Sequence, residues 1–416
     1  CADDDGPQLK SAASSKVDIG GLLESSEKTF LLFEEVTDNS QIYIDIQAKG
    51  ADSFDWGKPV RVAGPFAYSG EVPDLYSAAI SAQGTIAVAA LVSDRAVGIY
   101  VSSDGQKFTL KELPRQSNPV VGPRIYSTKT GGFLVFAASG ENETFSLLSS
   151  VSSNGETWTS LTPFAPSVTV TNPFAPALLS VEDGYIVVFQ GQYQYLQNGE
   201  NRRSYQLYAS KTSDNLKTWT PPTVVTNEKS LLYSSSGSFF NYNNQRPVLY
   251  SNGKKNYIAW ERTYYTSESA HIWVSEIDNF ANLSGGLYEL TTQGNAHRPV
   301  FFSYDDFLNV AWFDNRRGND NIYMAQSQGF AWEETRLVLL KDSSTFVYPV
   351  FTKKSDTSLS VQQLSFIWQQ QRSKQNSLIY TLTPDRTVLP PKILANNFKE
   401  GRRSTSQKVS ARVVLP

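Results

Sequence analysis

Three arginines occupy the same place in a repeated sequence pattern. Arg246 and Arg298 each stand directly before a proline and a short apolar segment, and Arg412 stands before the apolar end of the chain. Tyr348 holds the corresponding place before Pro349. A guanidinium group binds a carboxylate or phosphate through two parallel hydrogen bonds, and a tyrosine can stack on a ligand or donate to it. This pattern predicts a site for an anionic ligand, provided that the fold brings these side chains together.

Two acidic residues follow the next apolar segments along the chain. Glu261 comes after the segment that follows Arg246, and Asp314 comes after the segment that follows Arg298. Because neighbouring guanidinium groups repel one another, either these acids or an anionic ligand must compensate them. Both alternatives stay open: the arginines pair with the acids and line a polar channel mouth, or they bind a ligand. The candidate ligand-binding set is Arg246, Arg298, Tyr348, Arg412, Glu261 and Asp314.

An internal repeat supplies the elements that would position these residues. Each unit has an apolar strand, a turn, a second apolar strand, a polar loop and an Ile-Tyr-like pair, and the units recur about every 55 residues. Four short strands per unit at this period are typical of β-propeller blades. We therefore predict an all-β, seven-bladed β-propeller of four-stranded blades with essentially no helix. Residues 28–416 would form this single domain, and residues 1–27 a tether.

The two ends of the chain offer competing strands for the first blade. The C-terminal segment Arg412–Leu415 resembles the strand starts at Arg246 and Arg298, so it would complete the blade that the N-terminal part begins. Closure of the ring in this way would leave no open sheet edge at the seam. Val17–Leu23 is the alternative candidate for the same place. We expect the C-terminal strand to close the ring.

Strand parity places the candidate residues on one face of the ring. If inner strands start at one face, the second strands end there, close to the axis. The residues directly before the predicted inner strands are Tyr76, Gly122, Ala175, Arg246, Arg298, Tyr348 and Arg412. Four consecutive blades would therefore present long polar side chains at the same axial face.

A short turn motif recurs between predicted third and fourth strands. It reads Ser-Ser-Asp-Gly-Gln-Lys-Phe at 102–108 and Ser-Ser-Asn-Gly-Glu-Thr-Trp at 152–158, and a third copy occupies 212–219. The acidic or amide side chain would cap turn amides, glycine would take positive φ, and the aromatic would pack between sheets. The motif resembles the Asp-box, or BNR repeat, of sialidase-like propellers. Its structural residues here are Ser102, Asp104, Gly105, Phe108, Ser152, Asn154, Gly155, Trp158, Asp214 and Trp219.

The resemblance implies a sialidase-type use of the candidate residues. Sialidases use three arginines on the substrate carboxylate, a tyrosine nucleophile with a glutamate partner, and an aspartate as acid/base, and the candidate set contains these residue types. However, the early Phe-Arg-Ile-Pro motif of the family has its nearest match out of order, at 123–126, and sialidases have six blades. Spacing also assigns no nucleophile and base. We therefore favour a lipid-anchored propeller that binds a protein or glycan without catalysis. The alternatives are a sialidase-like glycosidase or sialoglycan-binding protein, and a structural subunit of an envelope assembly.

The only cysteine is the first residue, Cys1, and it is followed by a polar, acidic and serine-rich stretch. This start resembles a mature bacterial lipoprotein, whose N-terminal cysteine carries lipid. The expected location is the cell envelope, most simply the outer membrane, with an envelope protein or an anionic glycan as partner.

Composition excludes several other functions. The net charge of −3 argues against nucleic-acid binding through a general positive field. One cysteine and two histidines argue against a zinc site, so we predict neither a metal nor a cofactor. No apolar run has the length of a membrane-spanning helix.

Overall fold

The computed structural model of the chain describes most of its residues. The described residues are 16–36, 39, 41–50, 57–66, 74–213, 216–226, 242–264, 269–291, 294–304, 307–316, 321–327, 332–338, 344–356, 359–371, 377–382 and 399–400. Cys1, Asp214 and Arg412 lie outside them, so the predictions made for these three residues are not addressed by the structure. Within the described part, no helix is long and apolar enough to cross a membrane.

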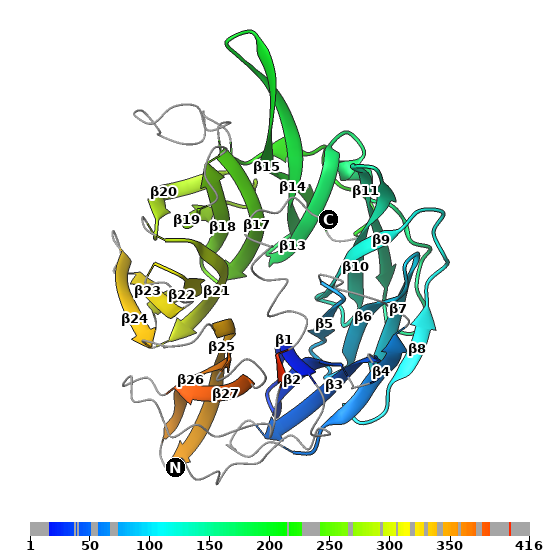
Figure 1. Cartoon of the computed structure of the whole chain (residues 1–416), viewed down its shortest axis with the longest axis vertical. Helices are drawn as coiled ribbons and strands as arrows, with labels where there is room; N and C mark the ends of the chain where they lie inside the picture. Colours follow the sequence, from blue (N-terminus) through cyan, green and yellow to red (C-terminus); the bar gives the residue numbers. More distant parts are fainter. Residues whose placement is uncertain are drawn as a thin grey trace.

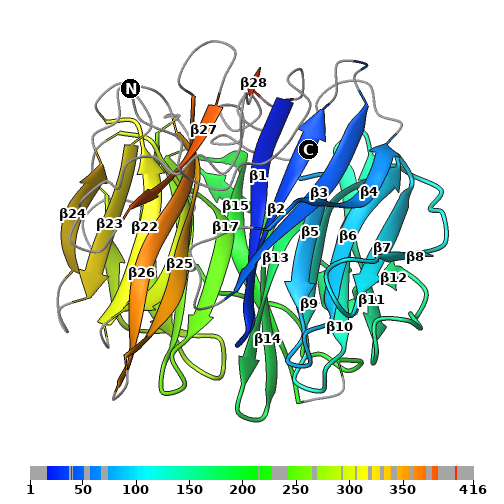
Figure 2. The same ribbon diagram turned by 90° about the horizontal axis from the view of Figure 1, so that it is seen from below.

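Antiparallel sheets stand side by side in a ring, with their strands running roughly along its axis (Figures 1 and 2). Apart from the two-residue strand β28 (Lys399–Glu400), which joins the first sheet, each described sheet is an up-and-down series of consecutive strands. The strands of the first three sheets are β1 (Lys16–Glu24), β2 (Lys28–Val36), β3 (Ile42–Gly50), β4 (Val60–Phe66), β5 (Tyr76–Ile80), β6 (Ile86–Ser93), β7 (Ala96–Ser102), β8 (Thr109–Glu112), β9 (Val120–Ser127), β10 (Phe133–Glu141), β11 (Thr144–Ser152) and β12 (Thr162–Pro163).

The next three sheets follow the same plan. Their strands are β13 (Thr171–Val181), β14 (Gly184–Gln197), β15 (Glu200–Thr212), β16 (Thr223–Val224), β17 (Tyr242–Ser251), β18 (Asn256–Tyr264), β19 (Ala270–Ile277), β20 (Leu283–Glu289), β21 (Ala296–Tyr304), β22 (Phe307–Asp314), β23 (Asn321–Ser327) and β24 (Trp332–Val338). The last sheet has three described strands, β25 (Ser344–Asp356), β26 (Leu359–Gln371) and β27 (Ser377–Leu382). The β14–β15 hairpin projects well beyond the ring (Figure 1).

The structure confirms an all-β propeller with almost no helix, and the one described helix is a single 3-10 turn at Ala165–Ser167. The predicted ring of seven four-stranded blades closed by a C-terminal strand is wrong. Six blades have a set of four antiparallel strands, whereas the described part of the β25–β27 sheet has three. The first blade is completed by β1, which pairs antiparallel with β2 from Lys16 to Glu24. This strand contains the alternative segment 17–23, and it has the apolar residues that a position beside β2 needs.

The C-terminal part of the chain contributes differently from the prediction. The two-residue strand β28 (Lys399–Glu400) pairs with β1 in parallel, and this makes the first sheet five-stranded. The N-terminal strand therefore lies between β2 and β28, and it forms the seam itself.

The apolar core lies between neighbouring blades. The second strands β2, β6, β10 and β22 are almost fully buried. The largest side chains that are less than 2% exposed are Trp260, Trp312, Phe33, Phe133, Phe136, Phe189 and Phe313. Burial of one such side chain stabilises the fold by about 1.5–3 kcal/mol. The rigid inter-blade packing that results fixes the inner strands, which carry the candidate residues.

The turns between third and fourth strands are held by their own side chains. After β7, Asp104 accepts hydrogen bonds from the N–H groups of Gln106 and Lys107 at 2.8 and 3.0 Å. Ser102 Oγ accepts from the N–H of Gly105, whose φ of 75° suits glycine. The side chains of this turn thus bond its own backbone amides.

The turn after β11 has the same arrangement. Ser152 Oγ accepts from the Gly155 N–H at 2.7 Å, and Trp158 donates to the Gly155 carbonyl at 2.9 Å. The Trp158 ring stacks on Phe133, with 6.4 Å between the ring centroids. In the third copy, Trp219 donates to the carbonyl of Leu216, which takes the positive-φ place of the glycine.

Candidate functional site

A β-bulge interrupts the inner strands of four consecutive blades directly before a proline. The residue before the proline is Gly122, Ala175, Arg246 or Arg298, with φ between 52° and 60°. The pairing with the second strand slips at each of these places. For a residue other than glycine, the left-handed conformation costs roughly 1–2 kcal/mol. Such strain persists only where the surroundings enforce it, and it gathers at functional sites.

An asparagine three residues before the left-handed residue joins three of the four bulges to the preceding blade. Asn172, Asn243 and Asn295 occupy this position before Ala175, Arg246 and Arg298. Their Oδ1 atoms accept hydrogen bonds from the N–H groups of Phe145, Tyr205 and Ala270, at 2.8 to 2.9 Å. The start of each of these three inner strands is thus fixed to the third strand of its neighbour.

The two arginine bulges have a second bond to the preceding blade. The N–H of Arg246 donates to Gln190 Oε1 on β14 at 3.0 Å. The N–H of Arg298 donates to Glu261 Oε1 on β18 at 3.1 Å. Both acceptors are buried, with 1% and 4% of their surface exposed. The left-handed backbone at each arginine is therefore held by a side chain from outside its own blade.

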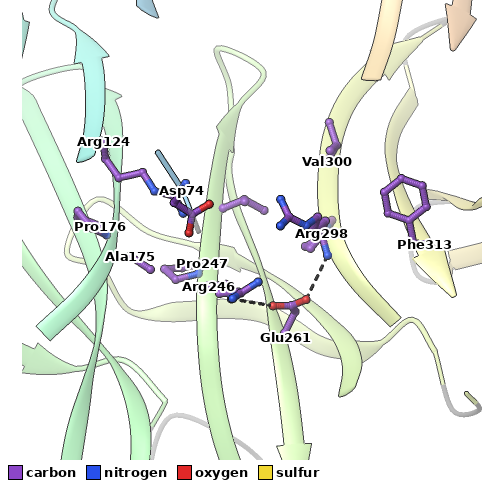
Figure 3. Close-up of a pocket in the computed structure, with 12 residues that line it drawn as sticks. Asp74, Arg124, Ala175, Pro176, Arg246, Pro247, Glu261, Arg298, Val300 and Phe313 are labelled. Carbon is purple, nitrogen blue, oxygen red and sulfur yellow. Dashed lines mark hydrogen bonds and ion pairs between the residues drawn. The ribbon is translucent and has the colours of Figure 1, made fainter. Parts of the chain in front are cut away.

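Three of these bulges, at Ala175, Arg246 and Arg298, line one pocket on the inner strands (Figure 3). The cavity has a volume of about 180 Å³, and its lining comes from inner strands, second strands and the turn before β5. Arg246 and Arg298 flank Glu261, whereas Arg124 extends from β9 towards Asp74 (Figure 3). The lining residues are Asp74, Arg124, Ala175, Pro176, Arg246, Pro247, Val248, Glu261, Arg298, Pro299, Val300 and Phe313.

The charges of the pocket do not balance. Three guanidinium groups, from Arg124, Arg246 and Arg298, stand against the carboxyl groups of Asp74 and Glu261. Arg246 Nε lies 3.6 Å from Glu261 Oε2. Burial raises the pKa of Glu261, against the opposing effects of the Arg246 guanidinium and the Arg298 N–H. The lining therefore favours an anion.

A buried histidine lies beside the pocket. His297 is 4% exposed, and its Nδ1 lies 4.0 Å from Glu261 Oε1. Burial, together with the charges of Arg298 and Arg246, lowers the pKa of His297 to about 4, although the Asp314 charge opposes the shift. His297 is therefore neutral near pH 7, and it does not add to the positive charge of the pocket.

The structure brings together three of the six residues that the sequence analysis selected. Arg246, Arg298 and Glu261 line one pocket. Asp314 is fully buried but lies outside the lining, because its Oδ2 is bound by Arg316 NH2 at 2.6 Å and by Arg316 Nε at 2.9 Å. Tyr348 belongs to β25, but its side chain lies outside the described structure, as does all of Arg412.

Sequence reasoning missed two charged residues of the pocket. Arg124 lies two residues after Gly122, so a search restricted to the residue before each inner strand passes over it. Asp74 stands in a turn before β5 with a φ of 52°. The spacing of Asn172, Asn243 and Asn295 from the prolines that follow them was a usable signal for the bulges.

Within the described residues, no group of three or more His, Cys, Asp or Glu side chains is arranged to hold a metal ion.

Comparison with known proteins gives no family assignment. No family model matches the chain, and no curated protein matches it. Solved structures do resemble it. The microbial sialidase Hz136 is 12% identical, with 72% of this chain and 64% of that chain covered and a TM-score of 0.44. The α-L-arabinanase of Penicillium chrysogenum, in complex with arabinobiose, is 14% identical over 71% of this chain and 88% of that chain, with a TM-score of 0.41.

A third similar structure is the endo-arabinase of Bacteroides thetaiotaomicron. It is 13% identical over 66% of this chain and 99% of that chain, with a TM-score of 0.38. These three structures carry the names of sialidase and arabinanase enzymes. They contradict our preference for an interaction module without catalysis, which we withdraw.

Proposed function

We propose that this chain is a glycan-processing propeller whose axial pocket takes a sugar unit that carries a carboxylate. The observation that carries the proposal is that Arg124, Arg246 and Arg298, from three different blades, line one pocket with only two carboxyl groups beside them. A carboxylate ligand would compensate the remaining positive charge, and it would accept hydrogen bonds from the guanidinium forks.

The chemistry of the pocket selects the ligand. A carboxylate satisfies the excess positive charge, and it fits the planar donor fork of arginine. The aliphatic and proline surfaces of Pro247, Val248 and Val300 offer contact to the apolar faces of a sugar ring. The cavity of about 180 Å³ suits one sugar unit at the end of a glycan.

The two carboxyl groups of the pocket have different parts in this proposal. Glycoside hydrolysis commonly uses a pair of carboxyl groups, one of which transfers a proton to the leaving oxygen. Both oxygens of Glu261 already face Arg298 and Arg246. We therefore assign Glu261 to holding the arginines, and Asp74 to proton transfer. The reaction class is sialidase-type hydrolysis of an acidic glycan.

Turnover of a fluorogenic sialoside tests this assignment. We expect the wild-type protein to release the fluorophore and Asp74→Asn to lose at least about 100-fold in kcat, because general acid–base groups commonly contribute about 10²–10⁴-fold. Asp183→Asn is the matched control, since Asp183 pairs with Lys211 outside the pocket lining. Full activity of Asp74→Asn would show that Asp74 does not transfer the proton. No turnover by the wild type of any acidic glycoside would refute hydrolysis.

Two further predictions from the sequence remain proposals. We propose that the turns at 102–108, 152–158 and 212–219 are Asp-box repeats, supported by the shared bonding of the first two. We also propose that Cys1 carries lipid and anchors the chain to a bacterial envelope membrane. An N-terminal peptide of the natural protein without lipid mass would refute the anchor.

A further inference from the structure

Two kinds of hydrogen bond join neighbouring blades, and they occur at different sets of bulges. The asparagine bond is present at the bulges of Ala175, Arg246 and Arg298 alike. The bond that the N–H of the left-handed residue donates to a Gln or Glu side chain is present at Arg246 and Arg298. The asparagine bond therefore accompanies the bulge itself, and the second bond accompanies the arginine.

At the bulge of Ala175, the strand register shows which residue of the preceding blade occupies the position of Gln190 and Glu261: it is Ala138. Gln190 and Glu261 each pair with the residue just before a left-handed residue of their own blade, and Ala138 does the same in the β9–β10 pair. The methyl group of Ala138 cannot accept a hydrogen bond, yet the next blade holds Ala175 in the left-handed conformation. The bulge thus forms without a side-chain acceptor.

We propose that Gln190 and Glu261 are positioning residues, which hold Arg246 and Arg298 so that their guanidinium groups enter the pocket. The role of the guanidinium groups in this inference rests on the proposed function. Gln190 is the clearer case, because it is 1% exposed and does not line the pocket. It can affect a ligand only through Arg246. Glu261 does the same for Arg298 and also faces the Arg246 side chain.

The test compares three variants. Gln190→Met keeps the length of the side chain and removes the acceptor. Gln190→Glu restores an acceptor of the kind that Glu261 provides in the next blade. Asn243→Ala removes the general seam bond at the same bulge and leaves Gln190 in place. The readouts are the position of the Arg246 guanidinium in crystal structures without ligand, the melting temperature, and the Kd for N-acetylneuraminic acid.

We expect Gln190→Met to displace or disorder the Arg246 guanidinium and to raise Kd at least tenfold, with a melting temperature close to that of the wild type. In Gln190→Glu, the guanidinium should return to its wild-type position. Asn243→Ala should lower the melting temperature and change Kd less than about threefold.

Two results would overturn the inference. One is an unmoved Arg246 with unchanged affinity in Gln190→Met, and this leaves the proposed function standing. The other is an equal loss of affinity in Asn243→Ala and Gln190→Met, which would mean that any loosening of the seam has the same effect. If the wild type binds no carboxylated sugar, the proposed function fails, but the guanidinium position still decides the inference.

Discussion

Replacement of Arg298 by alanine should weaken the binding of a carboxylated sugar about 10- to 100-fold and cost the fold little. A hydrogen bond to a charged group contributes about 1.5–3 kcal/mol, which corresponds to that loss of affinity. The fold should tolerate the change for two reasons. Ala175 already holds the same left-handed conformation before a proline. Glu261 keeps Arg246 Nε at 3.6 Å as its cationic neighbour.

Arg316→Ala is the matched control, because it should show the opposite behaviour. Arg316 binds the fully buried Asp314 through two nitrogens and does not line the pocket. Its removal leaves an uncompensated buried charge, which costs about 3–5 kcal/mol of stability. Affinity should be unchanged. Calorimetric titration and urea unfolding of both variants measure the two effects separately. Strong destabilisation by Arg298→Ala, without any ligand response in the wild type, would leave the arginines a structural role only.

A second large effect is expected from His297 at acid pH. Its pKa is about 4 in the folded protein, against 6.5 in an unfolded chain. Below pH 6.5, His297 becomes protonated in the unfolded chain but stays neutral in the folded protein. The free energy of unfolding therefore falls as the pH falls to about 4. One pKa unit corresponds to 1.36 kcal/mol, so this residue should account for a loss of about 3 kcal/mol over that range.

The test uses residues that the chain already has at the corresponding position. Phe174 and Gln245 stand where His297 stands, directly before the left-handed residue of their blades. Between pH 7 and pH 4, the free energy of unfolding should fall in the wild type and fall less in His297→Phe and His297→Gln. The difference between the wild type and each variant should be about 3 kcal/mol. Other titrating groups are common to all three proteins and cancel in the comparison. Parallel pH profiles for the wild type and both variants would show that His297 titrates normally in the fold.

The repeat made the strands and three of the five charged residues of the pocket predictable. The Pro-apolar segments located the inner strands, and their parity placed Arg246, Arg298 and Glu261 at one axial face, where the structure has them. Asp314 lies outside the pocket lining and is bound by Arg316, a charged neighbour two residues away. Strand parity predicts the face of the ring at which a side chain lies, but it does not predict which neighbouring side chain binds it.

The prediction from sequence rested on a single position at the start of each inner strand. Arg124 stands two residues after Gly122, just as Val248 and Val300 stand two residues after Arg246 and Arg298, and all three line the pocket. Ring closure was assigned to the wrong end of the chain because Arg412 and the apolar residues after it resemble the strand starts at Arg246 and Arg298. β1 lacks this pattern, and it pairs with β2 all the same, with its own irregularity between Ile19 and Gly21.

The central claim is that the axial arginines bind the carboxylate of a sugar, and a paired titration tests it most directly. The wild-type protein is titrated at low salt with N-acetylneuraminic acid and with its methyl ester, which keeps the sugar and removes the negative charge. The account predicts saturable binding of the acid, which Arg298→Ala weakens, and at least tenfold weaker binding of the ester. Equal affinity for the two sugars, or no binding of either, would contradict it.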